Sequence, residues 1–375
     1  MAIWHCSGEK RLEGACFVQG AKNAVLPILA ASVVCPTETD LLNVPQLSDV
    51  EMSLRILRSL GCTAQQQEND VYIDSRALSS NVIPQSMMES MRSSVLFMGA
   101  LLARCGEVHL TLPGGCRLGA RPIDMHLDAM KALGASVEES GCEIVCRAEK
   151  LRGAHIRLPY PSVGATENTL MAAVVANGTT FIENAAREPH IVDLANFLNS
   201  MGADIRGAGT DSIRIQGVER LHGGTYSVIP DQIEAGTYMT ACAAAGGEVL
   251  LTNVIPRHLE CISAKLREMG VTVVEGGDSV LVRSNGRLRH TNVKTQPYPG
   301  FPTDMQPQIS VALCLADGTS VVTEGVYDNR YRYIQELGRM GADAQVNGCT
   351  AVLNGVDGLH GAEVRACDLR AGAAV

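Results

Sequence analysis

The sequence lacks several features that mark common classes of protein. Aromatic residues make up only 4% of its 375 residues. The longest apolar run, residues 24–35, is broken by Pro27 and is shorter than the roughly 18 residues that span a membrane. The N-terminus has no basic segment followed by an apolar one, so it does not resemble a signal peptide. We therefore expect a soluble, cytoplasmic protein that does not insert into a membrane.

Signals for disulfides and metal sites are also missing. The thirteen cysteines are odd in number and include no CxxC pair. Cys142 and Cys146, the closest two, lack the matching second pair of a zinc site. We expect most cysteines to be small buried residues in a reducing compartment, and we expect no metal or cofactor.

The charge balance excludes one class of partner. The net charge of −9 argues against nonspecific binding of nucleic acid, which needs a basic face. A local arginine cluster can still bind a small anion, because local charge can outweigh the global sign. Hydrophobic residues make up 46% and charged residues 19%, a globular balance, and the length favours two domains.

What the sequence does contain is a repeat. A hydrophobic residue followed by glycine recurs five times, at intervals of 73, 68, 68 and 71 residues. Such regularity is typical of proteins built from repeated units. The five glycines are Gly61, Gly134, Gly202, Gly270 and Gly341.

Each repeat combines helices and strands. The run 124–133 before Gly134 is amphipathic, and glycine is a common helix stop. Short β-branched stretches follow the glycines, as at 70–73 and 212–216, and a second helix opens each unit, as at 166–177. The unit is therefore predicted as helix, strand, helix, strand, strand. The class is α/β but not a Rossmann sheet, since no GxGxxG follows a strand and no P-loop occurs.

The opening helices indicate six units. The sixth is followed only by residues 371–375, so we expect it to lack a helix, a strand and a helix, on the order of 45 residues. The expected starts lie near Lys22, Arg92, Thr166, Glu234, Asp304 and Arg370.

Three of these starts carry a cation. Lys22, Arg92 and Arg370 stand where the helix dipole disfavours positive charge by about 0.3–1 kcal/mol. Bound anions would explain the pattern, because helix N-termini already favour phosphate. The alternative is that these side chains point into solvent.

A glycine-rich segment carries a candidate nucleophile. In Leu112-Pro-Gly-Gly-Cys-Arg-Leu-Gly-Ala-Arg-Pro122, Cys116 lies between Arg117 and Arg121. Cationic neighbours lower the pKa of a thiol and make it reactive near neutral pH. Taken alone, the segment could equally be a hairpin with an inert cysteine.

Six segments together resemble the UDP-N-acetylglucosamine enolpyruvyl transferase family. They occur in the family's order and cover the chain from about residue 14 to residue 370. The segments are 20–24, 112–122, 162–166, 183–189, 301–305 and 368–370.

The resemblance implies a fold of two inside-out α/β barrels that close over a cleft. Each barrel would contain three repeats of about 70 residues, with the sixth incomplete. One domain would span residues 22–228, and the other residues 1–21 plus 229–375.

The resemblance also implies a reaction. The enolpyruvyl group of phosphoenolpyruvate would pass to the 3-hydroxyl of UDP-N-acetylglucosamine with release of phosphate, the first committed step of peptidoglycan synthesis. Lys22 and Arg121 would hold phosphoenolpyruvate, and Cys116 would be the general acid that fosfomycin alkylates. Asp304 would take the proton of the attacking hydroxyl, although the sequence alone also fits a helix N-cap there.

The remaining implied residues bind the substrates. Val163 and Val326 would otherwise be assigned to packing, and Asp368 could instead form a structural ion pair with an arginine. The substrate-binding set is Lys22, Asn23, Arg92, Arg121, Pro122, Ile123, Asp124, Met125, Ser162, Val163, Gly164, Asp304, Val326, Arg330, Asp368 and Arg370.

Two other interpretations stay open at this point. The sister family that uses shikimate 3-phosphate shares the barrels, but Cys116 and the 162–166 segment favour the nucleotide sugar. A catalytically impaired homologue that only binds the nucleotide sugar is the second, motivated by the short sixth unit. In addition, Tyr160 stands just before Pro161 and Ser162, near where the family often has a basic residue. The oligomeric state is not predicted.

Overall fold

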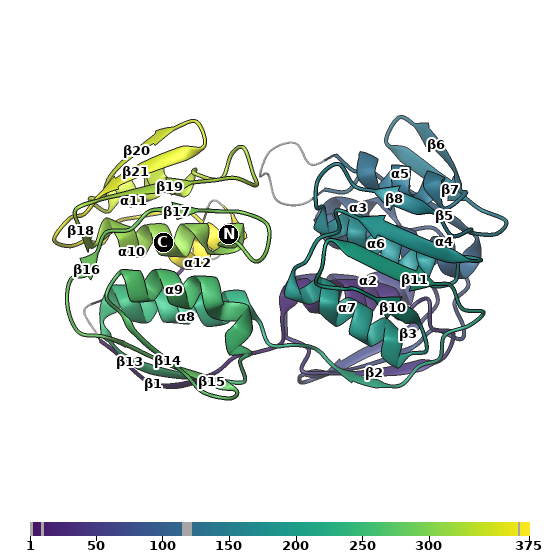
Figure 1. The fold of residues 1–375 in the computed structure, drawn as a ribbon, viewed down its shortest axis with the longest axis horizontal. Coiled ribbons are helices and arrows are strands. Elements are labelled where there is room, and N and C mark those ends of the chain that lie inside the picture. Colours follow the sequence, from purple (N-terminus) through teal and green to yellow (C-terminus); the bar gives the residue numbers. More distant parts are fainter. Residues whose placement is uncertain (1–2, 9–10, 115–121, 367) are drawn as a thin grey trace. The chain divides into compact units, whose positions relative to one another are not determined.

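The computed structural model describes the chain except residues 1–2, 9–10, 115–121 and 367. The chain forms two compact units (Figure 1). One unit contains residues 19–229, and the other contains residues 1–18 and 230–375.

The unit of residues 19–229 repeats the predicted order of elements three times. Its bounds are α1 (Lys22–Ala31), β2 (Glu38–Leu42), α2 (Ser48–Ser59), β3 (Thr63–Gln67), β4 (Asp70–Asp74), α3 (Gln85–Ser90), η1 (Arg92–Leu96), α4 (Phe97–Cys105), β5 (Glu107–Thr111), α5 (Asp124–Ala132), β6 (Ser136–Ser140), β7 (Glu143–Arg147), β8 (His155–Arg157), α6 (Val163–Ala173), β9 (Thr179–Glu183), α7 (Pro189–Ser200), β10 (Asp204–Arg206), β11 (Ser212–Gln216) and β12 (Thr225–Ser227).

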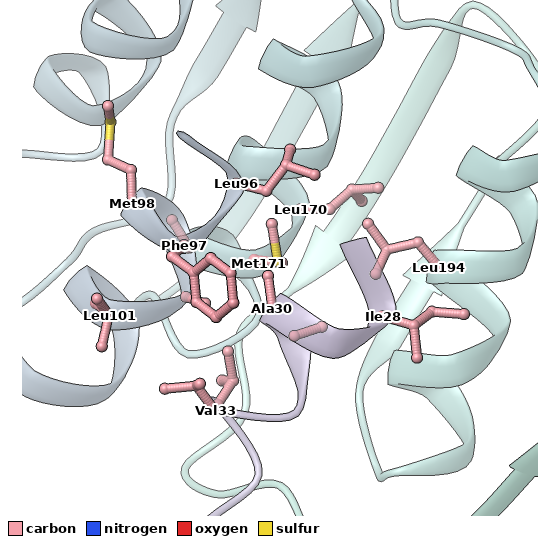
Figure 2. Close-up of a cluster of buried hydrophobic side chains, with 14 of the residues drawn as sticks. Ile28, Ala30, Val33, Leu96, Phe97, Met98, Leu101, Leu170, Met171 and Leu194 are labelled. Atoms are coloured by element: carbon pink, nitrogen blue, oxygen red, sulfur yellow. The ribbon is translucent and has the colours of Figure 1, made fainter. Parts of the chain in front are cut away.

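The helices that open these repeats form the core of the unit. In α1 every residue from Ala24 to Ala31 is buried, and in α6 every residue from Ala165 to Ala173 is buried. The apolar helix α1 belongs in an interior, and α6 also buries polar side chains such as Asn168, which are hydrogen-bonded there. Figure 2 shows how Ile28, Phe97 and Leu170 meet in this core, from α1, α4 and α6.

Sheets cover this helical core. Strands such as β2 alternate exposed and buried residues, so one face of each sheet packs inward and the other meets solvent. The three sheets have the strand orders β12-β2-β4-β3, β10-β11-β9-β8 and β5-β7-β6. In the two four-stranded sheets, β12 and β8 pair in parallel with β2 and β9. The β8 strand joins the second repeat to the third, and β12 joins the third to the first.

A glycine permits close contact between two core helices. A Cβ at Gly99 would lie 2.3 Å from the carbonyl oxygen of Asn168 in α6, so α4 can approach only without a side chain here. The Gly99 N–H lies in the first turn of α4 and donates to Oδ1 of Asn168 at 2.7 Å. This bond satisfies a helix N-terminal donor that would otherwise be unpaired in the interior.

The unit of residues 1–18 and 230–375 follows the same order. Its bounds are β1 (Leu12–Phe17), α8 (Gln232–Ala245), β13 (Gly247–Thr252), η2 (Pro256–Leu259), α9 (Glu260–Glu268), β14 (Thr272–Glu275), β15 (Ser279–Ser284), β16 (Leu288–Arg289), β17 (Val293–Lys294), η3 (Thr303–Met305), α10 (Gln306–Cys314), β18 (Ala316–Asp317), β19 (Thr319–Thr323), α11 (Tyr333–Arg339), β20 (Asp343–Asn347), β21 (Thr350–Asn354) and α12 (Leu369–Ala374).

This second unit is also built around opening helices. Helix α10 packs against both α8 and α12, and eight of its nine residues are buried. Its sheets have the orders β1-β13-β15-β14, β17-β19-β21-β20 and β16-β18. The N-terminal strand β1 pairs in parallel with β13, so residues 12–17 complete a sheet of this unit.

The five predicted helix stops are confirmed. Gly61, Gly134, Gly202, Gly270 and Gly341 have φ values of 92–101°, a region that L side chains rarely adopt. Each lies between a helix and the next strand, and the N–H of the residue after each donates back to that helix, as in Ala135 N to Met130 O at 3.0 Å.

Four expected helix starts are shifted, among them that of Asp304, which lies in the 3-10 turn η3 before α10 begins at Gln306. The helix expected from Thr166 begins at Val163, because Ser162 caps it, and the helix expected from Glu234 begins at Gln232 behind the Asp231 cap. Arg92 opens a 3-10 turn that leads into α4 and not a regular α-helix.

The expectation for the cysteines was only partly right. All eleven cysteines that the structure describes are free, but only Cys35, Cys62, Cys146, Cys242 and Cys314 are buried. Of the others, Cys16 and Cys261 are partly buried against the core of the second unit, and Cys6, Cys105, Cys142 and Cys349 are exposed. Within the described part of the chain, no helix combines the length and apolar character needed to cross a membrane.

Candidate active site

The unit of residues 19–229 presents one predicted cation at the start of its first helix. Lys22 is the first residue of α1, followed by Asn23, and its Nζ lies 2.7 Å from Oδ2 of Asp49 in α2. The Lys22 side chain is 19% exposed and the Asp49 side chain 31%. The ammonium group is thus held in place, yet solvent still reaches it.

The start of α6 is suited to an anion. Ser162 is its N-cap, and its Oγ accepts from the N–H of Ala165 at 3.3 Å. Val163 and Gly164 form the first turn, where backbone N–H groups have no partner within the helix. These N–H groups and the helix dipole favour a negative group here.

His126 in α5 joins this region to a buried polar network. Asn168 uses Oδ1 to accept from Gly99 N and Nδ2 to donate to Val95 O at 3.1 Å. The same Nδ2 lies 2.9 Å from Nδ1 of His126 and must donate to it. A neutral His126 therefore carries its proton on Nε2.

The Nε2 edge of His126 lies against the start of α6. A Cβ at Gly164 would lie 2.8 Å from Cε1 and 3.1 Å from Nε2 of this ring, so only glycine fits. Burial lowers the pKa of His126 to about 4, and the nearby charge of Arg92 acts in the same direction. The ring is 6% exposed and is a neutral donor at pH 7. Sequence reasoning missed His126, although its place two residues after Asp124 was a usable signal.

Four other expected residues of this unit, residues 122–125, lie at the start of α5. Asp124 and Met125 are its first two residues, Pro122 is exposed and Ile123 is buried just before it. Cys116 and Arg121 lie outside the described residues. Arg92, the first residue of η1, is close enough to His126 to affect its titration.

The second unit brings two predicted arginines, Arg330 and Arg370, together around the carboxylate of Asp304. Oδ1 of Asp304 accepts from Nη2 of Arg330 at 2.9 Å. Oδ2 of Asp304 accepts from Nε of Arg370 at 3.1 Å and lies 2.9 Å from its Nη2. Arg330 is 2% exposed and Arg370 16% exposed, so both guanidinium groups are largely removed from water. Such charge-assisted contacts are strong and directional.

The arginines control the charge of Asp304. Burial alone would raise the pKa of this carboxyl group, but the guanidinium groups of Arg370 and Arg330 outweigh burial. The pKa of Asp304 therefore lies well below its usual range, and the group is a carboxylate across the physiological range. In this arrangement it is a weak base, because accepting a proton would break two ion pairs.

Two sequence interpretations change here. Asp304 is not a helix N-cap, because Pro302 holds that position in η3 and the Asp304 carboxylate faces the two arginines. Asp368, by contrast, is a cap: its Oδ1 accepts from the N–H groups of Arg370 and Ala371, both at 2.9 Å. Asp368 thus orients the start of α12, which carries Arg370.

Val326 lies in a turn beside this cluster. Its backbone N–H donates to Oε1 of Glu324 at 2.9 Å, and the residue is half-buried. Outside the gaps at 1–2, 9–10, 115–121 and 367, no group of three or more His, Cys, Asp or Glu side chains is placed to hold a metal ion.

Comparison with known proteins places the chain in a class. The family model described as EPSP synthase (3-phosphoshikimate 1-carboxyvinyltransferase) matches residues 6–375. The fold is similar to that of the enolpyruvyl transferase NikO from Streptomyces tendae, with a TM-score of 0.84 at 24% identity over 93% of this chain and 83% of that one. EPSP synthase from Acinetobacter baumannii matches with a TM-score of 0.73 at 21% identity, over 98% and 89% of the two chains. The chain is therefore a carboxyvinyl transferase of the EPSP synthase family.

Sequence relatives narrow the assignment. A UDP-N-acetylglucosamine 1-carboxyvinyltransferase of Clostridium botulinum is 50% identical over 98% of this chain and 89% of its own length. Another, from Carboxydothermus hydrogenoformans, is 50% identical over 98% and 87%. Within the family, this chain belongs to the UDP-N-acetylglucosamine 1-carboxyvinyltransferases.

Proposed function

We propose that this chain transfers the enolpyruvyl group of phosphoenolpyruvate to the 3-hydroxyl of UDP-N-acetylglucosamine and releases phosphate. The observation that carries the proposal is the 50% identity to relatives of that name across 98% of the chain. The two charged regions described above supply groups that such a reaction needs. Cations must hold a carboxylate and a phosphate, and a base must accept the hydroxyl proton.

In the second unit, Asp304 is the proposed base. In the structure its two oxygens are occupied by Arg330 and Arg370. An anionic substrate that draws one guanidinium group away would raise the basicity of Asp304 when the hydroxyl is in place. Substrate binding would thereby create the base, and Asp368 would keep Arg370 oriented through the start of α12.

In the unit of residues 19–229, the proposed roles are binding and acid catalysis. Lys22 and Arg121 would hold phosphoenolpyruvate, and Cys116 would protonate its methylene carbon. The start of α6, with Ser162 and Arg92, would bind the diphosphate of the nucleotide sugar. Asn23, Pro122, Ile123, Asp124, Met125, Val163, Gly164 and, from the second unit, Val326 complete the proposed binding set.

The biological setting is part of the same proposal. The product is the first committed intermediate of peptidoglycan synthesis, whose nucleotide-sugar precursors are cytoplasmic, so we place the enzyme there. The net charge of −9 fits a partner list of small molecules without nucleic acid. We also propose that the two units correspond to barrel domains over residues 22–228 and over 1–21 plus 229–375.

Covalent labelling tests the proposal at one atom. Intact mass after exposure to fosfomycin should show a single adduct on Cys116, promoted by UDP-N-acetylglucosamine. Cys116→Ser should abolish the adduct, whereas Cys142→Ser, at an exposed cysteine outside the proposed site, should retain it. Labelling that persists in Cys116→Ser would remove Cys116 from the mechanism.

A further inference from the structure

Three repeats end their central strand in the same way. An asparagine follows β2, β9 and β13, and each adopts a positive φ of 55–58°. Each side-chain amide donates to a backbone carbonyl at 2.6–2.9 Å, just beyond the parallel strand that pairs with its own. The donor and acceptor pairs are Asn43 and Val228, Asn184 and Leu158, and Asn253 and Val18.

The repeat that contains β19 departs from this pattern at both positions. Glu324 follows β19 where these three repeats have asparagine, and Thr295 follows the parallel strand β17. The parallel pairing is kept, since Thr295 N donates to Thr323 O as Val18 N donates to Thr252 O. The turn differs, because Glu324 does not share the positive φ of the asparagines. Here the hydrogen bond joins two side chains: Thr295 Oγ1 donates to Oε1 of Glu324 at 2.7 Å.

Glu324 is a buried carboxylate, 4% exposed. Besides Thr295, it accepts from Thr303 Oγ1 at 3.0 Å and from the N–H groups of Val326 and Tyr327 at 2.9 and 3.2 Å. Burying a carboxylate costs free energy even when it is hydrogen-bonded. Three other repeats have a neutral asparagine at this position, so a buried charge here is not a general feature of the repeat.

The charge faces the arginine that holds the proposed base. Thr303 Oγ1 accepts from Nη1 of Arg330 at 2.8 Å, so its own proton is directed to Glu324. Nη2 of the same guanidinium donates to Asp304, and the group lies 5.4 Å from the ring centroid of Tyr327. Two of the three groups around Arg330, namely Thr303 and the Tyr327 turn, are thus bonded to Glu324.

We propose that Glu324 is a positioning residue that fixes the guanidinium group of Arg330 on Asp304 through Thr303 and the 326–327 turn. The inference rests on the proposed function, in which Asp304 accepts the hydroxyl proton. Glu324 also adds a buried negative charge beside a cluster in which two arginines share the carboxylate of Asp304.

The decisive variant is Glu324→Asn, which puts the residue of three other repeats at this position. It should fold, because asparagine keeps a hydrogen-bonding side chain here and removes the cost of burying a carboxylate. Turnover should fall about 100-fold, the size of effect expected when a catalytic group loses its placement, with a smaller change in KM for the nucleotide sugar.

Thr303 tests the route of the effect. Thr303→Ser keeps the hydroxyl and should retain turnover, whereas Thr303→Val removes it and should match Glu324→Asn. The double variant should be no worse than the poorer single variant, because both break the same connection. Independent, additive losses would exclude this route.

The matched control is Asn253→Gly, in the same unit. Its φ of 55° suits glycine, so only the side-chain tie to Val18 is lost. We expect unchanged turnover with a modest loss of stability. This control separates loss of the turn from loss of the charge.

A crystal structure of Glu324→Asn gives a readout that does not depend on activity. Nη2 of Arg330 should move beyond hydrogen-bond distance of Asp304. If the wild type releases no phosphate, the proposed function fails, yet a displaced guanidinium group still supports the positioning role. Wild-type turnover in Glu324→Asn, or an unmoved Arg330 in its structure, would overturn the inference.

Discussion

His126 shows at the scale of one residue how burial changes acid–base behaviour. Its pKa is about 4 in the folded chain, mainly through burial, against an ordinary value of about 6.5. Between these values the unfolded chain binds a proton that the folded chain does not. Above pH 6.5 the ring is neutral in both states and does not affect the free energy of unfolding. As the pH falls from 6.5 towards 4, the free energy of unfolding decreases by up to about 3 kcal/mol.

This pH dependence should be visible in a single substitution. Between pH 7.5 and pH 5 the free energy of unfolding should fall less in His126→Gln than in wild type, because the ring that resists protonation is gone. Denaturant unfolding at both pH values measures the slope. His222→Gln, at an exposed ring, is the control and should keep the wild-type slope. A wild-type slope in His126→Gln would contradict the assignment.

The sequence did not predict which side chains the candidate site residues contact. Lys22, Arg92 and Arg370 were predicted at helix starts, and each lies in the first two residues of its helix. The pairing of Asp304 with Arg370 spans 66 positions and depends on how α10 packs against α12. Local patterns carry no information on such a contact.

At the scale of the element, two glycine-to-alanine variants test why glycine follows the second helix of each repeat. Gly134 has a φ of 94°, and no neighbouring atom lies within 4 Å of the place that a Cβ would take, so Gly134→Ala adds backbone strain alone. We expect a loss of about 1–2 kcal/mol. Gly338 lies within α11 without a positive φ and with open space around it, so Gly338→Ala should instead stabilise by about 0.4–1 kcal/mol. Thermal unfolding of both variants measures the contrast, and equal shifts would refute the argument.

Element types were predictable where local chemistry decides them. The strand expected at 212–216 is β11 with the same bounds, and the helix expected over 124–133 is α5 to within a residue. Helix starts were displaced where a cap, such as Ser162, acts earlier than the apolar pattern suggests. The repeat also held an unused signal: aligning its units places Glu324 where three asparagines stand.

At the scale of the whole molecule, each of the two units carries its own group of proposed site residues. Residues 19–229 contribute Lys22, Arg92 and the start of α6, and the second unit contributes Asp304 with Arg330 and Arg370. Each unit has its own continuous hydrophobic core. The repeat predicted this α/β architecture, because the glycines that end helices recur at a near-constant interval even though the residues between them differ from unit to unit.

The central claim is the identity of the acceptor, and phosphate release tests it most directly. The full chain should release phosphate from phosphoenolpyruvate when UDP-N-acetylglucosamine is present, and Asp304→Asn, assayed in a demonstrably folded sample, should lose this activity. Shikimate 3-phosphate in place of the nucleotide sugar should give no release. Release with shikimate 3-phosphate, or none with UDP-N-acetylglucosamine from a folded chain, would contradict the account.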